Sequence, residues 1–350
     1  MRGRSQRGLY KCASLQSQAV HGQVGPEVML NLCMVGTGGI AAEHMKALRA
    51  LKGVEPCWVV SRTPQKAKEF AAQWGFEHAS ANLEEAVADT RVQLVVIASP
   101  SEQHSSQALL AMQTGRNVIV EIPVGLSFAE AETVANVSLQ SRCRALVCHT
   151  MRSFPAIREV RRRVQAGELH LSQIAGYFAI PRRRNQSRAG QRNWIDNLLW
   201  HHGCHMIDAA LWVLGTNEAE QVSAVVGKPH PQFGMAIDVA IHFRTSAQQV
   251  VTHSLTYNTE QFCWELRFIG DEDTLTFRNG QLLNDRNESV VPAASYLDLA
   301  AQDSQMLATL VGGTPSDYDI SSVLGTMQIL ETAAASAKSQ SMNETTRVEA

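Results

Sequence analysis

One stretch of the sequence decides the fold, Val35-Gly36-Thr37-Gly38-Gly39-Ile40-Ala41, which ends an apolar run and begins an amphipathic one. Its pattern is G-x-G-x-x-A. Gly36 allows a tight turn, Gly38 lets the backbone approach a pyrophosphate, and the small Ala41 lets the next helix pack closely on the strand. The N-terminus of that helix would offer N–H groups and the positive end of its dipole to phosphates. We therefore predict a dinucleotide site at Gly36, Thr37, Gly38, Gly39 and Ile40.

Beyond this turn, short apolar runs alternate with amphipathic stretches up to about residue 150. Strand and helix in alternation at this spacing predict a doubly wound parallel sheet with right-handed crossovers. The apolar runs are typical of strands that are buried on both faces. The expected strands are residues 30–35, 57–60, 94–98, 117–120 and 145–148, and the expected helices are 41–51, 64–74, 83–88, 101–114 and 127–141.

After residue 150 the rhythm changes, because strand-like runs follow one another without helices between them. Such a succession favours an open, mostly antiparallel sheet in a second α/β domain. We predict domains at 29–150 and 151–338, with a polar, frayed tail at 339–350. The expected elements are a helix at 156–166, strands at 172–180, 222–226, 236–243, 249–257, 264–269 and 271–280, and helices at 296–311 and 320–337.

Composition limits the class of protein. The 350 residues are 45% hydrophobic and 18% charged, with a formal net charge of −2, which predicts a soluble protein without nucleic-acid or membrane partners. No apolar run approaches the roughly 20 residues that cross a bilayer. The seven cysteines contain no C-x-x-C pair, so we expect reduced thiols and a cytoplasmic location.

The first 28 residues differ from the rest. They carry Arg2, Arg4, Arg7 and Lys11, and no acid precedes Glu27. They lack the apolar core of a secretory signal. We interpret them as a disordered extension or as the product of an upstream start codon, with a basic organelle-targeting segment as the alternative.

The end of the second strand indicates which dinucleotide binds. An NAD site usually has an acid there to hold the ribose 2′-OH, whereas this chain has Ser61-Arg62-Thr63. Arg62, with Ser61 and Thr63, suits a 2′-phosphate, which favours NADP over NAD. In the alternative interpretation, Arg62 stacks on the adenine or points into water.

The fourth and fifth strands also end in polar residues, at the edge where open α/β sheets bind ligands. Ser99, Pro100 and His104 follow the fourth strand, and Glu121 and Pro123 follow the fifth. We expect all five to lie at the cofactor. Glu121 would accept hydrogen bonds from the ribose or the nicotinamide, and His104 has the alternative of a bond to a backbone carbonyl.

These motifs resemble the Gfo/Idh/MocA family of oxidoreductases. The glycine turn, Ser99 to His104, Glu121 to Pro123 and the His-x-x-Asp of His205 to Asp208 occur in the family's order. The resemblance covers about residues 30–335. It implies a Rossmann domain followed by a domain with an open sheet, a nicotinamide cofactor, dimerisation through that sheet, and a small-molecule substrate, in most members a sugar or cyclitol.

The chain departs from the family pattern at two positions. Ile122 stands where the family usually has a lysine, and His201 stands where it usually has an aspartate, four residues before the histidine. Two interpretations follow: the chain is a degenerate, cofactor-binding regulator, or its proton chemistry differs.

The second interpretation is supported by resemblance to one branch of the family, the 4-carboxy-2-hydroxymuconate-6-semialdehyde dehydrogenases of aromatic-acid catabolism. The residues that carry it are Glu121-Ile122-Pro123, Cys148-His149-Thr150 with Arg152, the run from Trp194 to His205, and Gly234 to Asp238. The resemblance implies NADP-dependent oxidation of a cyclic hemiacetal to 2-pyrone-4,6-dicarboxylate. Sugar or cyclitol oxidation is the alternative.

Histidines supply the candidate base. His201 and His205 are four residues apart and share a helix face, which Asp208 extends. An imidazole titrates near neutral pH and can take a hydroxyl proton. We assign this duty jointly to His201, His202 and His205, with Asp208 orienting His205. Paired histidines can also bind zinc or be structural, but no H-E-x-x-H or cysteine partner accompanies them, so we predict no metal.

The most basic part of the core lies just before these histidines. Guanidinium groups pair with carboxylates in a bidentate way, so a loop of arginines near the site would suit a carboxylated substrate. A solvated surface loop is the alternative. The predicted substrate-binding residues are His149, Arg152, Arg183, Arg184 and Arg192.

Overall fold

The computed structural model describes residues 29–51, 53–182, 186–187, 190–191, 198–295 and 299–348. The predicted extension at 1–28 lies outside this range. In the N-terminal half, six strands form one parallel sheet in the order β3-β2-β1-β4-β5-β6. This is a Rossmann sheet, and it confirms the predicted doubly wound fold. Its strands are β1 (Leu30–Val35), β2 (Val54–Val60), β3 (His78–Ser80), β4 (Val92–Ile97), β5 (Asn117–Val120) and β6 (Ala145–Val147).

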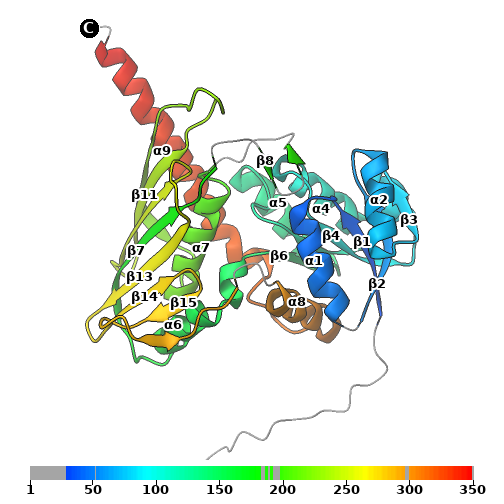
Figure 1. Ribbon diagram of the computed structural model, residues 1–350, viewed down its shortest axis with the longest axis horizontal. Coiled ribbons are helices and arrows are strands. Elements are labelled where there is room, and N and C mark those ends of the chain that lie inside the picture. The colour runs from blue at the N-terminus through cyan, green and yellow to red at the C-terminus, as the bar shows by residue number, and fades with distance from the viewer. Residues whose placement is uncertain are drawn as a thin grey trace, which may run out of the picture.

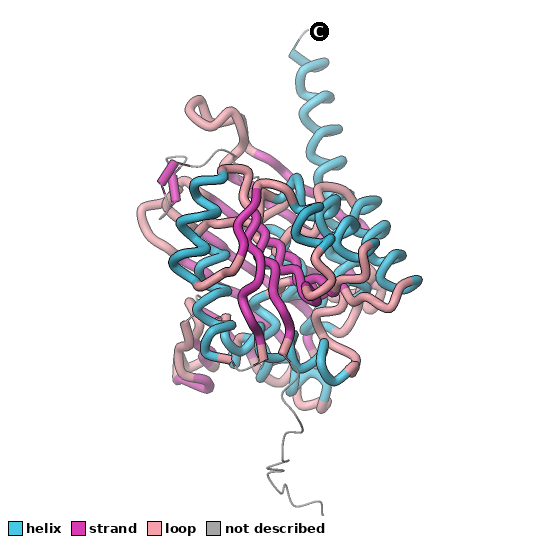
Figure 2. Tube along the Cα trace, turned by 90° about the vertical axis from the view of Figure 1, so that its right-hand side faces the viewer, coloured by secondary structure: helices cyan, strands magenta, loops and turns pink. Residues whose placement is uncertain are grey.

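Helices cover both faces of this sheet, as Figure 2 shows from the Rossmann side of the molecule. Helix α2 begins after Thr63 with a proline in its first turn and ends at Gly75, whose φ of 76° is the left-handed conformation common at helix C-termini. The helices are α1 (Gly39–Ala50), α2 (Pro64–Trp74), α3 (Leu83–Ala88), α4 (His104–Gln113) and α5 (Phe128–Gln140), with a 3₁₀ turn η1 (Ser101–Gln103) before α4.

Gly36 shows why the turn after β1 needs glycine. Its φ is 111°, and a Cβ at this position would lie 2.3 Å from the carbonyl oxygen of Ala98 at the end of β4. A side chain would therefore force the first and fourth strands apart. By contrast, a Cβ at Gly38 or Gly39 would meet nothing within 4 Å, so the outer side of the turn is open.

The C-terminal half contains an eight-stranded sheet in the order β10-β11-β12-β7-β13-β14-β15-β16. All its pairs are antiparallel except β12 with β7, because the chain leaves the sheet after β7 and returns through α7. The mostly antiparallel sheet is confirmed. Its strands are β7 (Leu171–Ala179), β10 (Ala219–Val226), β11 (Asp238–Thr245), β12 (Val250–Thr256), β13 (Cys263–Gly270), β14 (Thr274–Arg278), β15 (Gln281–Leu283) and β16 (Ser289–Val291), and a separate pair joins β8 (Gln186–Ser187) to β9 (Gly190–Gln191).

Within the described part of the chain, helices cover one face of the eight-stranded sheet. Helices α6 and α7 lie between it and the Rossmann half, and α9 runs along its β10 edge and projects beyond it (Figure 1). Residues on β11 alternate between buried and exposed, as expected for a sheet with one bare face. The remaining elements are η2 (Thr150–Ser153), α6 (Pro155–Gln165), α7 (His202–Leu214), α8 (Ala300–Gly312), η3 (Ile320–Val323) and α9 (Leu324–Val348).

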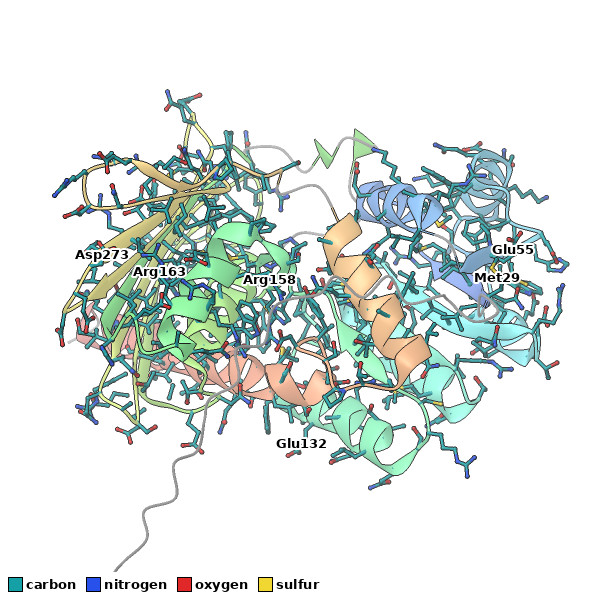
Figure 3. The ribbon with its side chains drawn as sticks, turned by 90° about the horizontal axis from the view of Figure 1, so that it is seen from below. Met29, Glu55, Glu132, Arg158, Arg163 and Asp273 are labelled. Carbon is teal, nitrogen blue, oxygen red and sulfur yellow. The ribbon has the colours of Figure 1, made fainter. Side chains whose placement is uncertain are left out.

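The C-terminal segment returns to the Rossmann half. Helix α8 packs along α1, and the two lie side by side in Figure 3. Just beyond α8, the chain follows β6, where the Val147 amide donates to the Tyr318 carbonyl at 2.8 Å. Arg144 also pairs with Asp319 at 2.7 Å. The two halves are therefore joined at more than the crossover near residue 150.

Two details differ from the sequence predictions. The three-residue β3, like β15 and β16, is too short to give a periodic signal. At the other end, α9 continues to Val348 through the segment predicted to be frayed. None of the described helices is long and apolar enough to cross a membrane.

Candidate active site

A cavity of about 970 Å³ runs along the carboxyl ends of the Rossmann strands to the first turn of α7. One end is lined by the glycine turn, and the other by the α7 histidines together with residues of β7 and β13. Open α/β sheets bind ligands at this edge, and the volume lies at the upper end of the range for cofactor and drug-sized ligands.

The glycine turn forms the phosphate end of the cavity. Gly38 precedes α1, and no side chain caps the N-terminus of this helix. Its first amides, and the open side of Gly38 and Gly39, are therefore available to an anion. These residues fit a pyrophosphate. All five predicted residues line the cavity: Gly36, Thr37, Gly38, Gly39 and Ile40.

The adenosine end of the cavity contains two cations. Ser61, Arg62 and Thr63 line it as predicted, and so does Lys66, which sequence reasoning missed. Lys66 lies one turn into α2, three residues after Thr63, and this helical spacing was the signal available. The Thr37 hydroxyl lies 3.2 Å from that of Ser61, which ties the glycine turn to the end of β2.

His104 holds two cavity loops together. Its Nδ1 lies 2.7 Å from the carbonyl oxygen of Pro123, and its Nε2 lies 2.8 Å from that of Ser99. The ring therefore bonds backbone carbonyls near the cofactor cavity, which was the alternative named for it. Ser99, Pro100, His104 and Glu121 line the cavity, whereas Pro123 contributes only its carbonyl to this bridge.

The three candidate histidines come together at the beginning of α7, and all line the cavity. The ring centroids of His201 and His202 are 4.4 Å apart, and His205 lies 6.2 Å from His201 and 6.4 Å from His202. His202 is fixed by its neighbours, because it stacks on Phe178 at 4.3 Å and its Nδ1 lies 2.8 Å from the Tyr257 hydroxyl.

His205 differs from His202 in its hydrogen bonding. Within the described part of the chain, no residue hydrogen-bonds to its ring, and its Nδ1 is buried. Burial lowers the pKa of His205, although the carboxylates of Glu121 and Asp208 oppose that shift. The ring is therefore neutral near neutral pH, as a general base must be.

Asp208 pairs with Arg152, where we had predicted that it would orient His205. Arg152 Nε lies 2.8 Å from Asp208 Oδ2, and the other Arg152 nitrogens bond Ser322 and the Asp317 carbonyl. Burial alone would raise the pKa of Asp208, but Arg152 and His149 hold it below its usual value. This ion pair joins α7 to η2, and the remaining bonds of Arg152 extend the link to Ser322 in η3.

His149 and Arg152, both predicted to bind substrate, do not line the cavity. His149 lies behind His205, with ring centroids 6.4 Å apart, and its Nδ1 is 3.2 Å from Asp208 Oδ2. Burial, with help from Arg152, lowers the pKa of His149 to about 3 despite the opposing charge of Asp208, so the ring stays neutral. The other three predicted arginines, Arg183, Arg184 and Arg192, lie outside the described residues.

The end of the cavity beside α7, where we expect the substrate, is mainly aromatic. Phe178 meets Trp264 edge to face at 5.5 Å and Phe262 at 6.2 Å, and Ile122 lines the same space at 3% exposure. At its rim lies Arg182, whose guanidinium is 5.0 Å from the Tyr257 ring centroid. These aromatics could not be recognised from the sequence, because strand residues that alternate between buried and exposed positions resemble ordinary core residues.

One group of potential metal ligands occurs among the described residues, formed by His44, Glu121 and Cys148. His44 Nε2 lies 2.9 Å from Glu121 Oε1, at hydrogen-bonding distance. Burial raises the pKa of the Cys148 thiol to about 12, so the thiolate that a metal would need is disfavoured. We interpret the group as a hydrogen-bonded cluster.

Comparisons with known proteins agree with this architecture. Residues 30–149 match the family model described as "Oxidoreductase family, NAD-binding Rossmann fold", and residues 155–294 match "Bacterial oxidoreductases, C-terminal". The chain is 30% identical over 306 residues to 4-carboxy-2-hydroxymuconate-6-semialdehyde dehydrogenase of Sphingobium sp. (strain NBRC 103272 / SYK-6), covering 86% of this chain and 96% of that protein.

Solved structures show the same fold at lower identity. GenD2 from gentamicin A biosynthesis, in complex with NAD, superposes with a TM-score of 0.78 at 20% identity, covering 91% of this chain and 97% of its own. Levoglucosan dehydrogenase in complex with NADH and levoglucosan also has a TM-score of 0.78, at 18% identity, covering 89% and 97%. The chain belongs to the Gfo/Idh/MocA family and is an NAD(P)-dependent oxidoreductase.

Proposed function

We propose that this enzyme oxidises a carboxylated cyclic hemiacetal to a lactone with NADP⁺. The substrate class is that of 4-carboxy-2-hydroxymuconate-6-semialdehyde, whose hemiacetal would give 2-pyrone-4,6-dicarboxylate. The similarity to the Sphingobium protein of that name supports the proposal over 86% of this chain.

The observation that carries the proposal is the apolar wall at the substrate end. Ile122 occupies the position where the family pattern has a lysine, and Phe178 and Trp264 face the same space. A polyol needs a partner for each hydroxyl it buries. A flat, conjugated ring makes favourable contacts with aromatic faces and requires fewer polar partners.

The cavity residues divide the chemistry between them. An oxidised nicotinamide held in this cavity would supply the hydride acceptor for the hemiacetal carbon. His205 takes the hydroxyl proton, and the C–O bond becomes the lactone carbonyl, so one substrate yields a two-electron-oxidised product and one proton. A hemiacetal hydroxyl is more acidic than a sugar hydroxyl, and a neutral imidazole is therefore a sufficient base without a lysine.

His201 and His202 position the substrate in this scheme. His202 is held by Phe178 and by Tyr257, whose buried hydroxyl lies 3.3 Å from Arg182 Nη1. The Arg182 guanidinium, at the cavity rim, would pair with a substrate carboxylate. The hydroxyl of Tyr257 thus connects the Arg182 guanidinium to the His202 ring.

NADP preference is part of the proposal. Arg62 and Lys66 place two cations at the adenosine end, beside the hydroxyls of Ser61 and Thr63. A 2′-phosphate would be held by charge-assisted bonds there.

We also propose a homodimer formed through the bare face of the eight-stranded sheet. Tyr177, Val225 and Val250 are 41%, 57% and 42% exposed, which is unusual for large apolar side chains in a monomer's sheet. A mass of twice 38.4 kDa by light scattering supports this assembly, and a monomer at micromolar concentration contradicts it.

A substrate panel tests the reaction. Reduction of NADP⁺ or NAD⁺ is followed at 340 nm with the carboxylated semialdehyde, with sugars and with cyclitols. We expect turnover of the semialdehyde with NADP⁺, and 2-pyrone-4,6-dicarboxylate as the product by mass spectrometry. Turnover of a polyol alone would identify a sugar or cyclitol dehydrogenase, and cofactor binding without any turnover would identify a regulator.

A further inference from the structure

A buried cluster of three ionisable side chains borders the cavity at Glu121. His44 of α1 has Nδ1 2.9 Å from Asp303 Oδ2 of α8 and Nε2 2.9 Å from Glu121 Oε1 at the end of β5. The side chains are 1%, 0% and 14% exposed for His44, Asp303 and Glu121. An imidazole therefore stands between two carboxylates with almost no access to water.

The charges of this cluster follow from its geometry. Burial on its own would lower the pKa of His44, but Asp303 and Glu121 together raise it well above its usual value. Burial likewise opposes ionisation of Glu121, yet the bond from His44 and the nearby His205 lower its pKa. The state that this geometry favours is carboxylate–imidazolium–carboxylate, with a net charge of −1.

Glu121 is the member of this cluster that lines the cavity. Its Oε2 accepts from the Ile122 amide at 3.2 Å, while Oε1 is bound by His44, so both oxygens are anchored. Glu121 and His205 line the same cavity and interact electrostatically. Because position 122 is an isoleucine, no amine stands there to neutralise the carboxylate.

Other charged groups near His205 cancel each other. From α7, Asp208 faces it but is paired with Arg152 of η2, which leaves that pair neutral. His149, after β6, is kept neutral by burial. His201 and His202 share the α7 turn, and Trp264 of β13 is uncharged. Among the described neighbours, the Glu121 cluster is the source of unbalanced negative charge.

We propose that Glu121 is the fixed counter-charge for the imidazolium that forms on His205 when it takes the substrate's hydroxyl proton, and that His44 and Asp303 position Glu121 for this duty. This inference rests on the proposed function in assigning the base to His205. It gives Glu121 a task different from the cofactor contact expected from the sequence. It also makes α8 of the C-terminal segment part of the Rossmann-side machinery.

The direct test is the titration of His205 in the full-length protein saturated with NADP⁺. Histidines are labelled with ¹³C at Cε1, and the His205 resonance is assigned by its loss in H205Q. We expect its pH midpoint to fall in E121Q, because removing an anion makes protonation harder. In D303N the midpoint falls less, since Asp303 lies on the far side of His44. In E132Q, an exposed change on α5 (labelled in Figure 3), it stays in place.

The kinetic arm separates a counter-charge from a cofactor contact. In E121Q we expect the acid limb of kcat/KM to move to lower pH and the plateau of kcat to fall about tenfold, since 1.4 kcal/mol in the barrier is a factor of ten. A rise in KM for NADP⁺ with an unmoved limb would show a cofactor contact only and would overturn the proposal.

An unmoved His205 midpoint in E121Q also overturns it, and if E121Q does not fold, an unmoved midpoint in D303N has the same meaning. Failure of the proposed function looks different: H205Q would then keep full activity on the semialdehyde. If H205Q is inactive but the His205 midpoint does not move in E121Q, the assignment of His205 as the base stands and only the counter-charge proposal fails.

Discussion

Asp208, three residues after His205, is bound by Arg152 with Nε to Oδ2 at 2.8 Å, and it is not among the residues that line the cavity. Both side chains are at most 2% exposed. A motif carboxylate that looked catalytic in the sequence thus joins α7 to η2 through Arg152 and to α9 through Thr326, whose Oγ1 lies 3.3 Å from Asp208 Oδ1. The ion pair thus holds the helix that carries His202 and His205.

Removing one partner of this pair should unfold the protein more easily. We expect D208N to lower the free energy of unfolding by about 3–5 kcal/mol, because it leaves the Arg152 guanidinium buried without its counter-ion. Urea titration followed by fluorescence measures the change, with D285N in an exposed turn as the matched control. Equal stability of the two variants would show that the pair is dispensable.

The pH dependence of the same pair has a definite sign. The pKa of Asp208 is lowered in the folded protein, so its contribution to stability is complete above the ordinary aspartate pKa and is lost as pH falls through the folded value. The wild-type protein should therefore lose more unfolding free energy than D208N between pH 5 and pH 3. Parallel pH profiles for the two proteins would contradict this.

Exchanging Arg62 should alter the choice of cofactor. We expect R62A to lower kcat/KM for NADP⁺ by about 10- to 100-fold, the effect of losing a charged hydrogen bond of about 1.5–3 kcal/mol, while the value for NAD⁺ changes little. Initial rates with both cofactors give the ratio. R142A, an exposed arginine between α5 and β6, controls for loss of charge, and an unchanged NADP⁺:NAD⁺ ratio in R62A would assign the 2′-phosphate elsewhere.

The base assignment predicts a kinetic profile. Burial lowers the pKa of His205 below the ordinary 6.5, so the acid limb of kcat/KM should have its midpoint below that pH. H205A should lose about 10²- to 10⁴-fold in kcat, the usual contribution of a general base, and retain NADP⁺ affinity by fluorescence titration. Should H201A lose as much while H205A stays active, His201 is the base.

Substitutions of Ile122 test whether an apolar side chain at this position, in place of the family's lysine, favours the semialdehyde. I122K would place an ammonium in an apolar wall and beside Glu121, and we expect kcat/KM for the semialdehyde to fall at least about tenfold through loss of packing and of negative charge at His205. I122M conserves volume and should remain within about twofold. Improved turnover of the semialdehyde by I122K would remove the argument based on the apolar wall.

The fold was predictable because its signals are local and repeated. Both sheets could be recognised from runs of apolar residues at the spacing of strands. Glycine is required at position 36 because a Cβ there would collide with the backbone of Ala98. That the glycine turn and residues 61–63 line the cavity was predictable for the same reason: they follow directly after β1 and β2, so their sequence position determines their place at the edge of the sheet.

The part of the site that comes from the C-terminal half could not be predicted in this way. Phe178 and Trp264 lie on strands that pair only in the folded sheet, and strand pairing between distant segments leaves no trace in one sequence. Arg152 and Asp208 carried the right chemistry for a site, but burial makes them partners of each other. The His44–Asp303 contact spans 259 residues and has no local pattern at all.

The closure of β6 by residues 318–319 has a practical meaning for anyone who would divide or recombine this enzyme. A fragment that ended near residue 150 would keep every Rossmann strand but would expose the edge of β6. It would also remove Asp303, the carboxylate that α8 provides to His44. An exposed edge strand can pair with strands of other chains, which leads to aggregation. Chimeras with relatives should therefore exchange the front half together with residues 300–319, a non-contiguous cassette, rather than cut the chain once.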